Sequence, residues 1–131
     1  MMALRLRTIM LYVSDVARSK AFYTTLLDAK VMPDYASEWF TMLALPESPP
    51  LALFDVSHGL PAGVSASPGG FELDFEVEDI EEIYQDWQGN DVELVTEIFS
   101  SPDGNLRLFY AKDPDGHSLA IFQTQQARAE P

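Results

Sequence analysis

The stretch Phe71-Glu72-Leu73-Asp74-Phe75-Glu76-Val77, followed by Glu78-Asp79, alternates apolar and acidic residues without a break. This alternation predicts a β-strand with two different faces, because successive side chains of a strand point in opposite directions. One face is apolar, and the other carries Glu72, Asp74 and Glu76 at a spacing of about 7 Å. Charges on an amphipathic strand commonly face water. The rest of the chain decides between that interpretation and a row of carboxylates that lines a site.

The composition indicates a globular protein with a strong acidic bias. The chain has 131 residues, 47% of them hydrophobic, which suits one compact domain or two small modules that share a core. Acidic residues outnumber basic ones by 21 to 8, for a formal net charge of −13. This excess argues against nucleic acid and anionic membranes as partners, because both need Lys and Arg patches. It would attract a cationic ligand if it were focused in a cleft, and otherwise it favours solubility.

The sequence also limits the chemistry and the compartment. There is no cysteine, which excludes disulfides, thiolate catalysis and cysteine-based metal sites. We find no signal peptide, no transit-like segment and no apolar run long enough to span a bilayer. We therefore expect a soluble cytoplasmic protein.

The first half of the chain predicts one helix and four strands. Ser14-Asp15 provide N-cap side chains for a helix that runs to about Asp28. Pro33 interrupts the second strand, so we expect an edge strand or a bend there. The four predicted strands are Leu6–Val13, Lys30–Tyr35, Trp39–Leu45 and Leu51–Val56.

A segment rich in Gly, Pro, Ser and Ala, residues 57–70, separates the two halves and predicts either a connector or a flap over a pocket. After it the same order begins again. Asp79 and Glu82 fit a capping box, and the apolar residues that follow recur at helical spacing until Gly89-Asn90. The predicted strands of this half are Phe71–Val77, Val92–Phe99, Leu106–Ala111 and His117–Gln123.

The repeat is visible in residues as well as in order. Tyr12–Val16 resembles Glu76–Ile80 at an offset of 64, and Leu51–Phe54 resembles Leu119–Phe122 at an offset of 68. A single unit of one helix on a small sheet cannot bury both faces of that sheet. We therefore expect the units to pair, within the chain or with a second copy.

Val13-Ser14-Asp15 with Ser19, Phe22-Tyr23 and Leu26, and the closing run Asp113-Pro114-Asp115-Gly116-His117-Ser118-Leu119, resemble the vicinal oxygen chelate superfamily over about residues 4–124. That group includes glyoxalase I, extradiol dioxygenases and bleomycin-resistance proteins. The resemblance implies an α+β fold in which paired βαβββ modules form a cupped mixed sheet with the helices outside, commonly in a homodimer. On this basis we predict one domain over residues 1–131: module 1 (4–56), linker (57–70), module 2 (71–124) and a frayed tail (125–131).

The resemblance also indicates where a metal would be held in related metalloenzymes. The corresponding positions are Thr8, Ala52, Glu72 and Ala120, and only Glu72 is a good ligand. A divalent cation needs three or more converging groups. We therefore expect no metal and no cofactor. We interpret His58 and His117 as surface residues.

If the cup forms as in the family, alternation carries the same-face neighbours of Thr8 and Glu72 into it. Arg107, which lies inside a predicted strand, could pair with one of the carboxylates. The aromatic residues fit a ligand wall or ordinary core packing. The predicted ligand-binding residues are Thr8, Met10, Tyr12, Trp39, Phe54, Glu72, Asp74, Glu76, Arg107 and Phe122.

An acidic, aromatic cup suits a cationic or planar organic molecule. The leading hypothesis is a metal-independent small-molecule binder of the bleomycin-resistance type, with antibiotic sequestration as one instance. The alternative is a lyase, isomerase or dioxygenase-like enzyme of the same superfamily, with Glu72 as general base or with a residual metal site. A purely structural dimeric module is a third interpretation.

Overall fold

The computed structural model describes residues 6–62, 64–66 and 71–125. The chain divides into two compact units, Met1–Pro68 (unit 1) and Gly69–Pro131 (unit 2), so the boundary falls inside the segment predicted as a linker. Residues 4–5 of the predicted first module, 63 and 67–70 of the linker and 126–131 of the tail lie outside the described residues.

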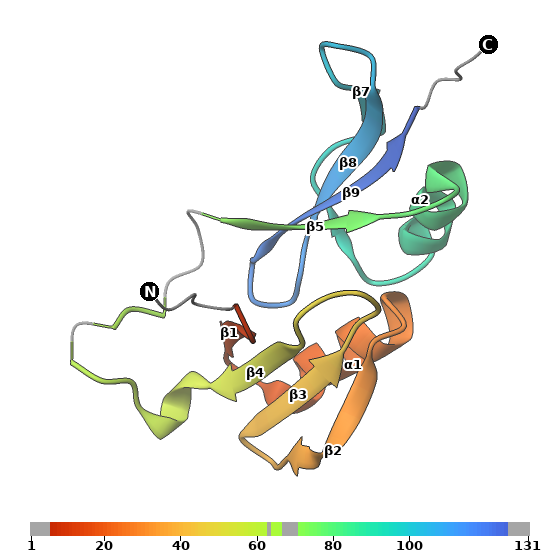
Figure 1. The fold of residues 1–131 in the computed structure, drawn as a ribbon. Helices are drawn as coiled ribbons and strands as arrows, with labels where there is room; N and C mark the ends of the chain where they lie inside the picture. Colours follow the sequence, from red (N-terminus) through yellow and green to blue (C-terminus); the bar gives the residue numbers. More distant parts are fainter. Residues whose placement is uncertain (1–5, 63, 67–70, 126–131) are drawn as a thin grey trace, which may run out of the picture. The chain divides into compact units, whose positions relative to one another are not determined.

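Unit 1 is a four-stranded sheet with a helix (Figure 1). The strand order is β1-β4-β3-β2, in which β1 and β4 are parallel and the other neighbours are antiparallel. β2 is an edge strand, and its register with β3 shifts between Val31 and Ala36, on either side of Pro33. This confirms the predicted edge or bend. The elements are β1 (Ile9–Val13), α1 (Val16–Leu26), β2 (Lys30–Ala36), β3 (Phe40–Ala44), β4 (Leu51–Asp55) and the short 3-10 helix η1 (Val56–His58).

Helix α1 begins where the sequence predicts. Asp15 is its N-cap, and its carboxylate accepts a hydrogen bond from the backbone N–H of Arg18 at 3.1 Å. The helix packs on β3 and β4. The side chains buried on this side of the sheet are almost fully excluded from solvent: Leu11, Val13, Thr41, Leu43, Leu51 and Leu53.

Unit 2 repeats the plan, with the strand order β5-β9-β8-β6 and with β7 also paired to β8 (Figure 1). Its helix packs on the sheet through Tyr84 and Trp87, whose rings contact Phe109 edge-on with centroids 5.0 and 5.7 Å away. The elements are β5 (Glu72–Glu76), α2 (Ile80–Gln88), β6 (Glu93–Leu94), β7 (Phe99–Ser100), β8 (Leu106–Lys112) and β9 (Ser118–Thr124).

The prediction of one continuous strand over Val92–Phe99 is wrong. The structure has two short strands there, β6 and β7. Between them the backbone N–H groups of Val95 and Thr96 both donate to the carbonyl oxygen of Tyr110, and the Thr96 hydroxyl accepts from the Tyr110 N–H. Two residues therefore oppose one, which is a β-bulge that interrupts the ladder.

The internal repeat extends to strand register. In unit 1, Ile9 is paired with Leu51, and in unit 2 Leu73 is paired with Leu119. These are the pairs that the offsets of 64 and 68 relate to each other. The two βαβββ units make an α+β fold, as predicted. None of the helices in the described part of the chain is long and apolar enough to cross a membrane.

Candidate functional site

The three acidic side chains of β5 lie on the face of the unit 2 sheet opposite α2. Strand register places them in rows with β9 and β8: Glu72 with Ser118 and Lys112, Asp74 with Ala120 and Tyr110, Glu76 with Phe122 and Leu108. We call these nine residues the helix-free face of unit 2. The row therefore lies beside the aromatic rings of Tyr110 and Phe122, as the sequence predicts for Phe122.

Glu72 and Asp74 are both exposed, and Asp74 affects the ionisation of Glu72. The pKa of Glu72 is raised above its ordinary value of 4.5, mainly by a hydrogen bond with the Asp74 side chain, then by partial burial and the Asp74 charge. Among the described residues, no ion pair within 4.0 Å involves Glu72, Asp74 or Glu76. The face thus presents carboxylates that no cation of the described chain neutralises at close range.

Among the aromatic residues of this face, Tyr110 best fits the role of a ligand contact. Its pKa is raised, first by burial and then by the charges of Glu72 and Asp74, which places the phenol within their field. Its ring stacks on Phe99 at a centroid separation of 6.2 Å and an interplanar angle of 22°. The ladder with β9 places Tyr110 and its neighbour Phe109 on opposite faces, because Phe109 lies on the side of α2.

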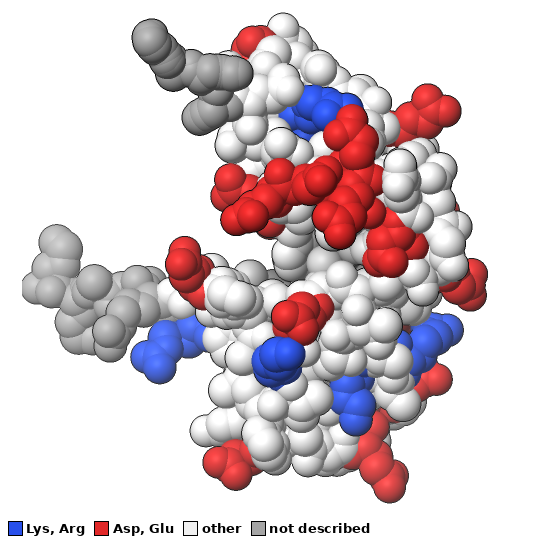
Figure 2. Space-filling view, turned by 90° about the vertical axis from the view of Figure 1, so that its right-hand side faces the viewer, with Lys and Arg blue, Asp and Glu red and all other residues white. Residues whose placement is uncertain are grey.

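The charge of the chain is concentrated in unit 2. Residues 1–68 hold six acidic and five basic residues, whereas residues 69–131 hold fifteen acidic and three basic ones, so their formal charges are −1 and −12. On the face shown in Figure 2, acidic side chains crowd unit 2, whereas acidic and basic side chains are mixed on unit 1. A cation that approaches unit 2 therefore meets a predominantly negative electrostatic field.

Arg107 does not pair with the strand carboxylates, and that expectation is wrong. Its guanidinium donates to Glu81 on α2 at 2.6 Å. Register explains the difference, since Arg107 is paired with Gln123 on the side of the sheet that α2 covers. The ion pair raises the pKa of Arg107 and lowers that of Glu81.

The predicted site residues of unit 1 form an aromatic cluster on the side of the sheet away from α1. The ring of Phe54 contacts both Tyr12 and Trp39, with centroids 6.4 and 5.8 Å away. Met10, which is 44% exposed, lies in register with Ala52, and Thr8 lies just before β1. The cup that would combine these residues with unit 2 stays a prediction.

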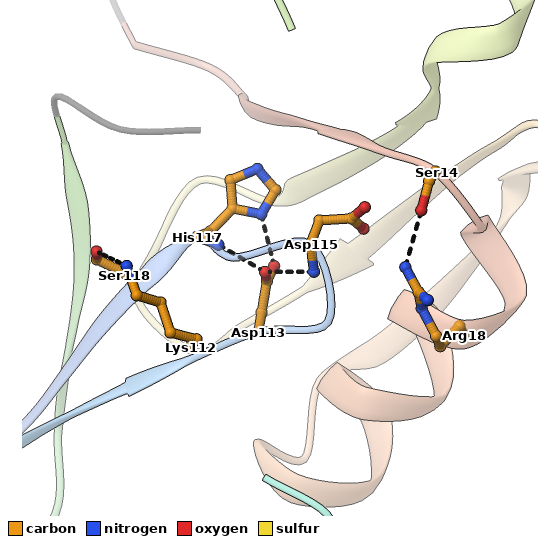
Figure 3. Close-up of polar contacts among 7 residues, drawn as sticks. All are labelled: Ser14, Arg18, Lys112, Asp113, Asp115, His117 and Ser118. Carbon is orange, nitrogen blue, oxygen red and sulfur yellow. Dashed lines mark hydrogen bonds and ion pairs between the residues drawn. The ribbon is translucent and has the colours of Figure 1, made fainter. Parts of the chain in front are cut away.

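One of the two histidines is not a surface residue. His58 is exposed and stacks on Trp39 at 5.0 Å. His117, in contrast, is only 3% exposed, so its predicted surface location is wrong. Its Nδ1 lies 2.7 Å from Asp113 Oδ2, and the other oxygen of Asp113 accepts from the backbone N–H groups of Asp115 and His117 (Figure 3). The Asp-Pro-Asp-Gly-His turn is thus organised around one buried carboxylate, a structural reason for a histidine at this place.

Residues 5–121 match the Glyoxalase/Bleomycin resistance protein/Dioxygenase superfamily. The chain belongs to this superfamily. The match covers both units, which confirms the resemblance seen in the sequence.

Solved structures of similar fold include a glyoxalase-related enzyme, a lactoylglutathione lyase and a protein of unknown function. A protein of Agrobacterium tumefaciens solved by NMR is 25% identical, with a TM-score of 0.77 over 95% of this chain and 100% of its own. A glyoxalase-related enzyme from Fulvimarina pelagi is 19% identical (TM-score 0.77; 93% and 89% covered). A lactoylglutathione lyase from A. tumefaciens is 17% identical (0.73; 96% and 98%). A search of curated proteins gave no match. At such identities the likeness shows the fold and leaves the activity open.

The superfamily's metalloenzymes imply a metal, and the residues present here do not fit one. Ala52 and Ala120 occupy two of the four corresponding positions, and both are buried methyl groups without a ligand atom. Thr8 and Glu72 would leave a cation with too few protein ligands. Across the described residues, no three His, Asp or Glu side chains are grouped to hold a metal ion.

Proposed function

We propose that this protein is a small-molecule-binding member of the superfamily that holds a cationic aromatic compound on the helix-free face of unit 2. Binding needs no metal in this proposal, and sequestration of an antibiotic is one instance of it. The proposal rests on one observation: Glu72 and Asp74, which form no ion pair among the described residues, lie on the same sheet face as the ring of Tyr110.

Each part of that face supports a different part of the ligand. Carboxylates pair with a positive group, and the ring of Tyr110 offers a surface for stacking or for a cation–π contact. The formal charge of −12 on unit 2 would raise the local concentration of cations and speed their association. The proposal therefore favours compounds that carry a positive group over compounds that carry none.

The enzymatic alternative has less support. A general base of raised pKa suits proton abstraction, and the pKa of Glu72 is indeed raised. However, Glu72 is exposed, and exposure to water weakens a base that has to act on a carbon acid. The main cause of the shift is the neighbouring Asp74 rather than a dry pocket.

The test is a thermal-shift screen of cationic aromatic compounds, including glycopeptide antibiotics, followed by calorimetric titration of the hits. A ligand at 100 times its Kd should raise the free energy of unfolding by about 2.7 kcal/mol. The variant Glu72→Gln/Asp74→Asn should weaken binding about tenfold, since two charge contacts are lost.

The matched control is Glu82→Gln/Asp86→Asn, which removes the same charge from α2 and leaves the helix-free face intact. It should change the affinity by less than about threefold, through the general field alone. A screen without hits, or equal losses in the two variants, would contradict the proposal.

A further inference from the structure

Lys112 is the basic residue on the helix-free face of unit 2. The structure describes two basic residues in this unit, and the other one, Arg107, lies on the side of α2. Lys112 is half-buried at the end of β8, in one row with Ser118 of β9 and Glu72 of β5. The ammonium of Lys112 would repel a purely cationic ligand on this face, and it can pair with a negative group of a ligand.

The contacts of Lys112 leave it available to such a partner. Its ammonium donates to Ser118 Oγ at 3.3 Å (Figure 3), and within the described residues it forms no ion pair within 4.0 Å. An ammonium group has three donors, so at least one more hydrogen bond can be made. Glu93 of β6 is also in register with Lys112 but is exposed and makes no ion pair with it.

The row of Lys112, Ser118 and Glu72 is wide enough for a small ligand to contact both charged side chains. Two strand spacings separate Lys112 from Glu72, about 10 Å between their Cα atoms, with the short side chain of Ser118 between them. Both long side chains can reach a group held above Ser118. The next rows along the strands carry Tyr110, Ala120 and Phe122, which suit a flat ring.

We propose that the ligand of this face is a small aromatic zwitterion, such as an aromatic amino acid or a compound with that head group. Its ammonium contacts Glu72 and Asp74, its anionic group contacts the ammonium of Lys112 and the hydroxyl of Ser118, and its ring lies along Tyr110 and Phe122. This inference rests on the proposed function and narrows its ligand class. A purely cationic ligand would leave Lys112 repelling it, whereas a zwitterion pairs both charges.

The test compares three probes with one ring: tryptamine (cation), tryptophan (zwitterion) and indole-3-propionate (anion), each titrated by calorimetry. Tryptophan should bind about fivefold more tightly than tryptamine, the effect of one added charge contact on a partly exposed face. In Lys112→Met this preference should disappear, with tryptamine bound as well as before or better. Lys112→Arg should keep the preference, because it keeps the charge.

Lys30→Met is the matched control, since Lys30 is an exposed lysine of unit 1 paired with Asp28. It should leave the preference unchanged, and thermal unfolding of each variant checks that it folds. If tryptamine binds through Glu72 and Asp74 without any preference for tryptophan, or if the preference survives in Lys112→Met, the zwitterion inference is wrong and the proposed function stands. If neither tryptamine nor tryptophan binds, or if indole-3-propionate binds best, both are wrong.

Discussion

Glu72 and Asp74 are two residues apart on one strand, so their side chains leave the sheet on the same side. The Asp74 carboxyl group makes the ionisation of Glu72 less favourable, and the pKa of Glu72 is raised accordingly. A folded-state pKa above the ordinary value means that protonated Glu72 stabilises the fold in acid. This contribution is lost as the pH rises through the folded pKa.

Replacing Asp74 by Asn tests this coupling. Asp74→Asn removes the like charge and offers an amide donor to Glu72, so the pKa of Glu72 should fall toward 4.5 or below. At neutral pH the free energy of unfolding should rise by at most about 0.5 kcal/mol, since the pair is exposed. Carbon-13 NMR of the Glu72 carboxyl group across a pH titration measures the first effect. A pKa unchanged in the variant would show that Asp74 is not the cause.

Loss of the Asp113 side chain should destabilise the fold strongly. Its carboxylate is buried and accepts from two backbone N–H groups and lies against His117 Nδ1. Asp113→Ala would leave these buried groups without an acceptor, and the free energy of unfolding should fall by about 3 kcal/mol.

Urea denaturation measures the change, and Asp113→Asn is its control. The amide oxygen of Asn can still accept from the backbone N–H groups, so that variant should lose less than Ala does. Equal losses in Asn and Ala would indicate that the charge, rather than the set of acceptors, stabilises the turn.

At the scale of elements, each helix begins at an N-cap aspartate that the sequence predicts, Asp15 for α1 and Asp79 for α2. Helix α2 begins at the cap that the sequence predicts, with the Asp79 carboxylate accepting from the Glu82 N–H at 3.2 Å. A second acceptor comes from the sheet, where Gln123 Oε1 on β9 accepts from the Ile80 N–H at 2.9 Å. Only the first of these could be read from the sequence, because the second joins residues that are 43 positions apart.

Removal of the local cap should have a moderate effect. Asp79→Ala should lower the free energy of unfolding by about 1 kcal/mol, the usual contribution of an N-cap side chain. Chemical denaturation followed by circular dichroism gives the value. Glu78→Ala, one residue earlier and outside the helix, should change it by less than about 0.5 kcal/mol, and a larger effect there than at Asp79 would contradict the assignment of the cap.

The alternation of apolar and polar residues predicts where the strands lie. It does not predict every strand interruption or the face on which every side chain lies. Pro33 marked the irregular edge strand correctly. The sequence does not predict the bulge at Val95 and Thr96, because this bulge depends on the carbonyl oxygen of Tyr110 in another strand. The sequence does not predict the face of Arg107 either, since only the ladder with β9 determines on which side of the sheet its side chain lies. Local patterns predict elements, and pairing partners decide where their side chains point.

At the scale of the whole molecule, the two units have the same topology but very different net charges. The two units share element order and the register of their parallel strands. Their charges have diverged, to −1 for residues 1–68 and −12 for residues 69–131. The candidate ligand face lies in the unit that carries this charge, and the other unit offers mainly aromatic groups such as Trp39, which is 42% exposed.

A homodimer remains the predicted assembly of the chain. Each unit has helix-free sheet residues that are apolar and partly exposed, and such surface is costly to leave in water. Light scattering coupled to size-exclusion chromatography should give twice the 14.6 kDa of one chain. A single-chain mass over the whole range of concentrations would contradict the prediction without affecting the ligand face of unit 2.

The most direct measurement is an amide chemical-shift map of the protein during titration with tryptamine. The predicted result is saturable shifts that concentrate in Glu72–Glu76, Leu106–Lys112 and Ser118–Thr124, the strands that carry the helix-free face. Higher salt should weaken the binding, because added ions screen the exposed carboxylates. Shifts confined to residues 9–55, or no saturable shifts at all, would contradict the location of the site on unit 2.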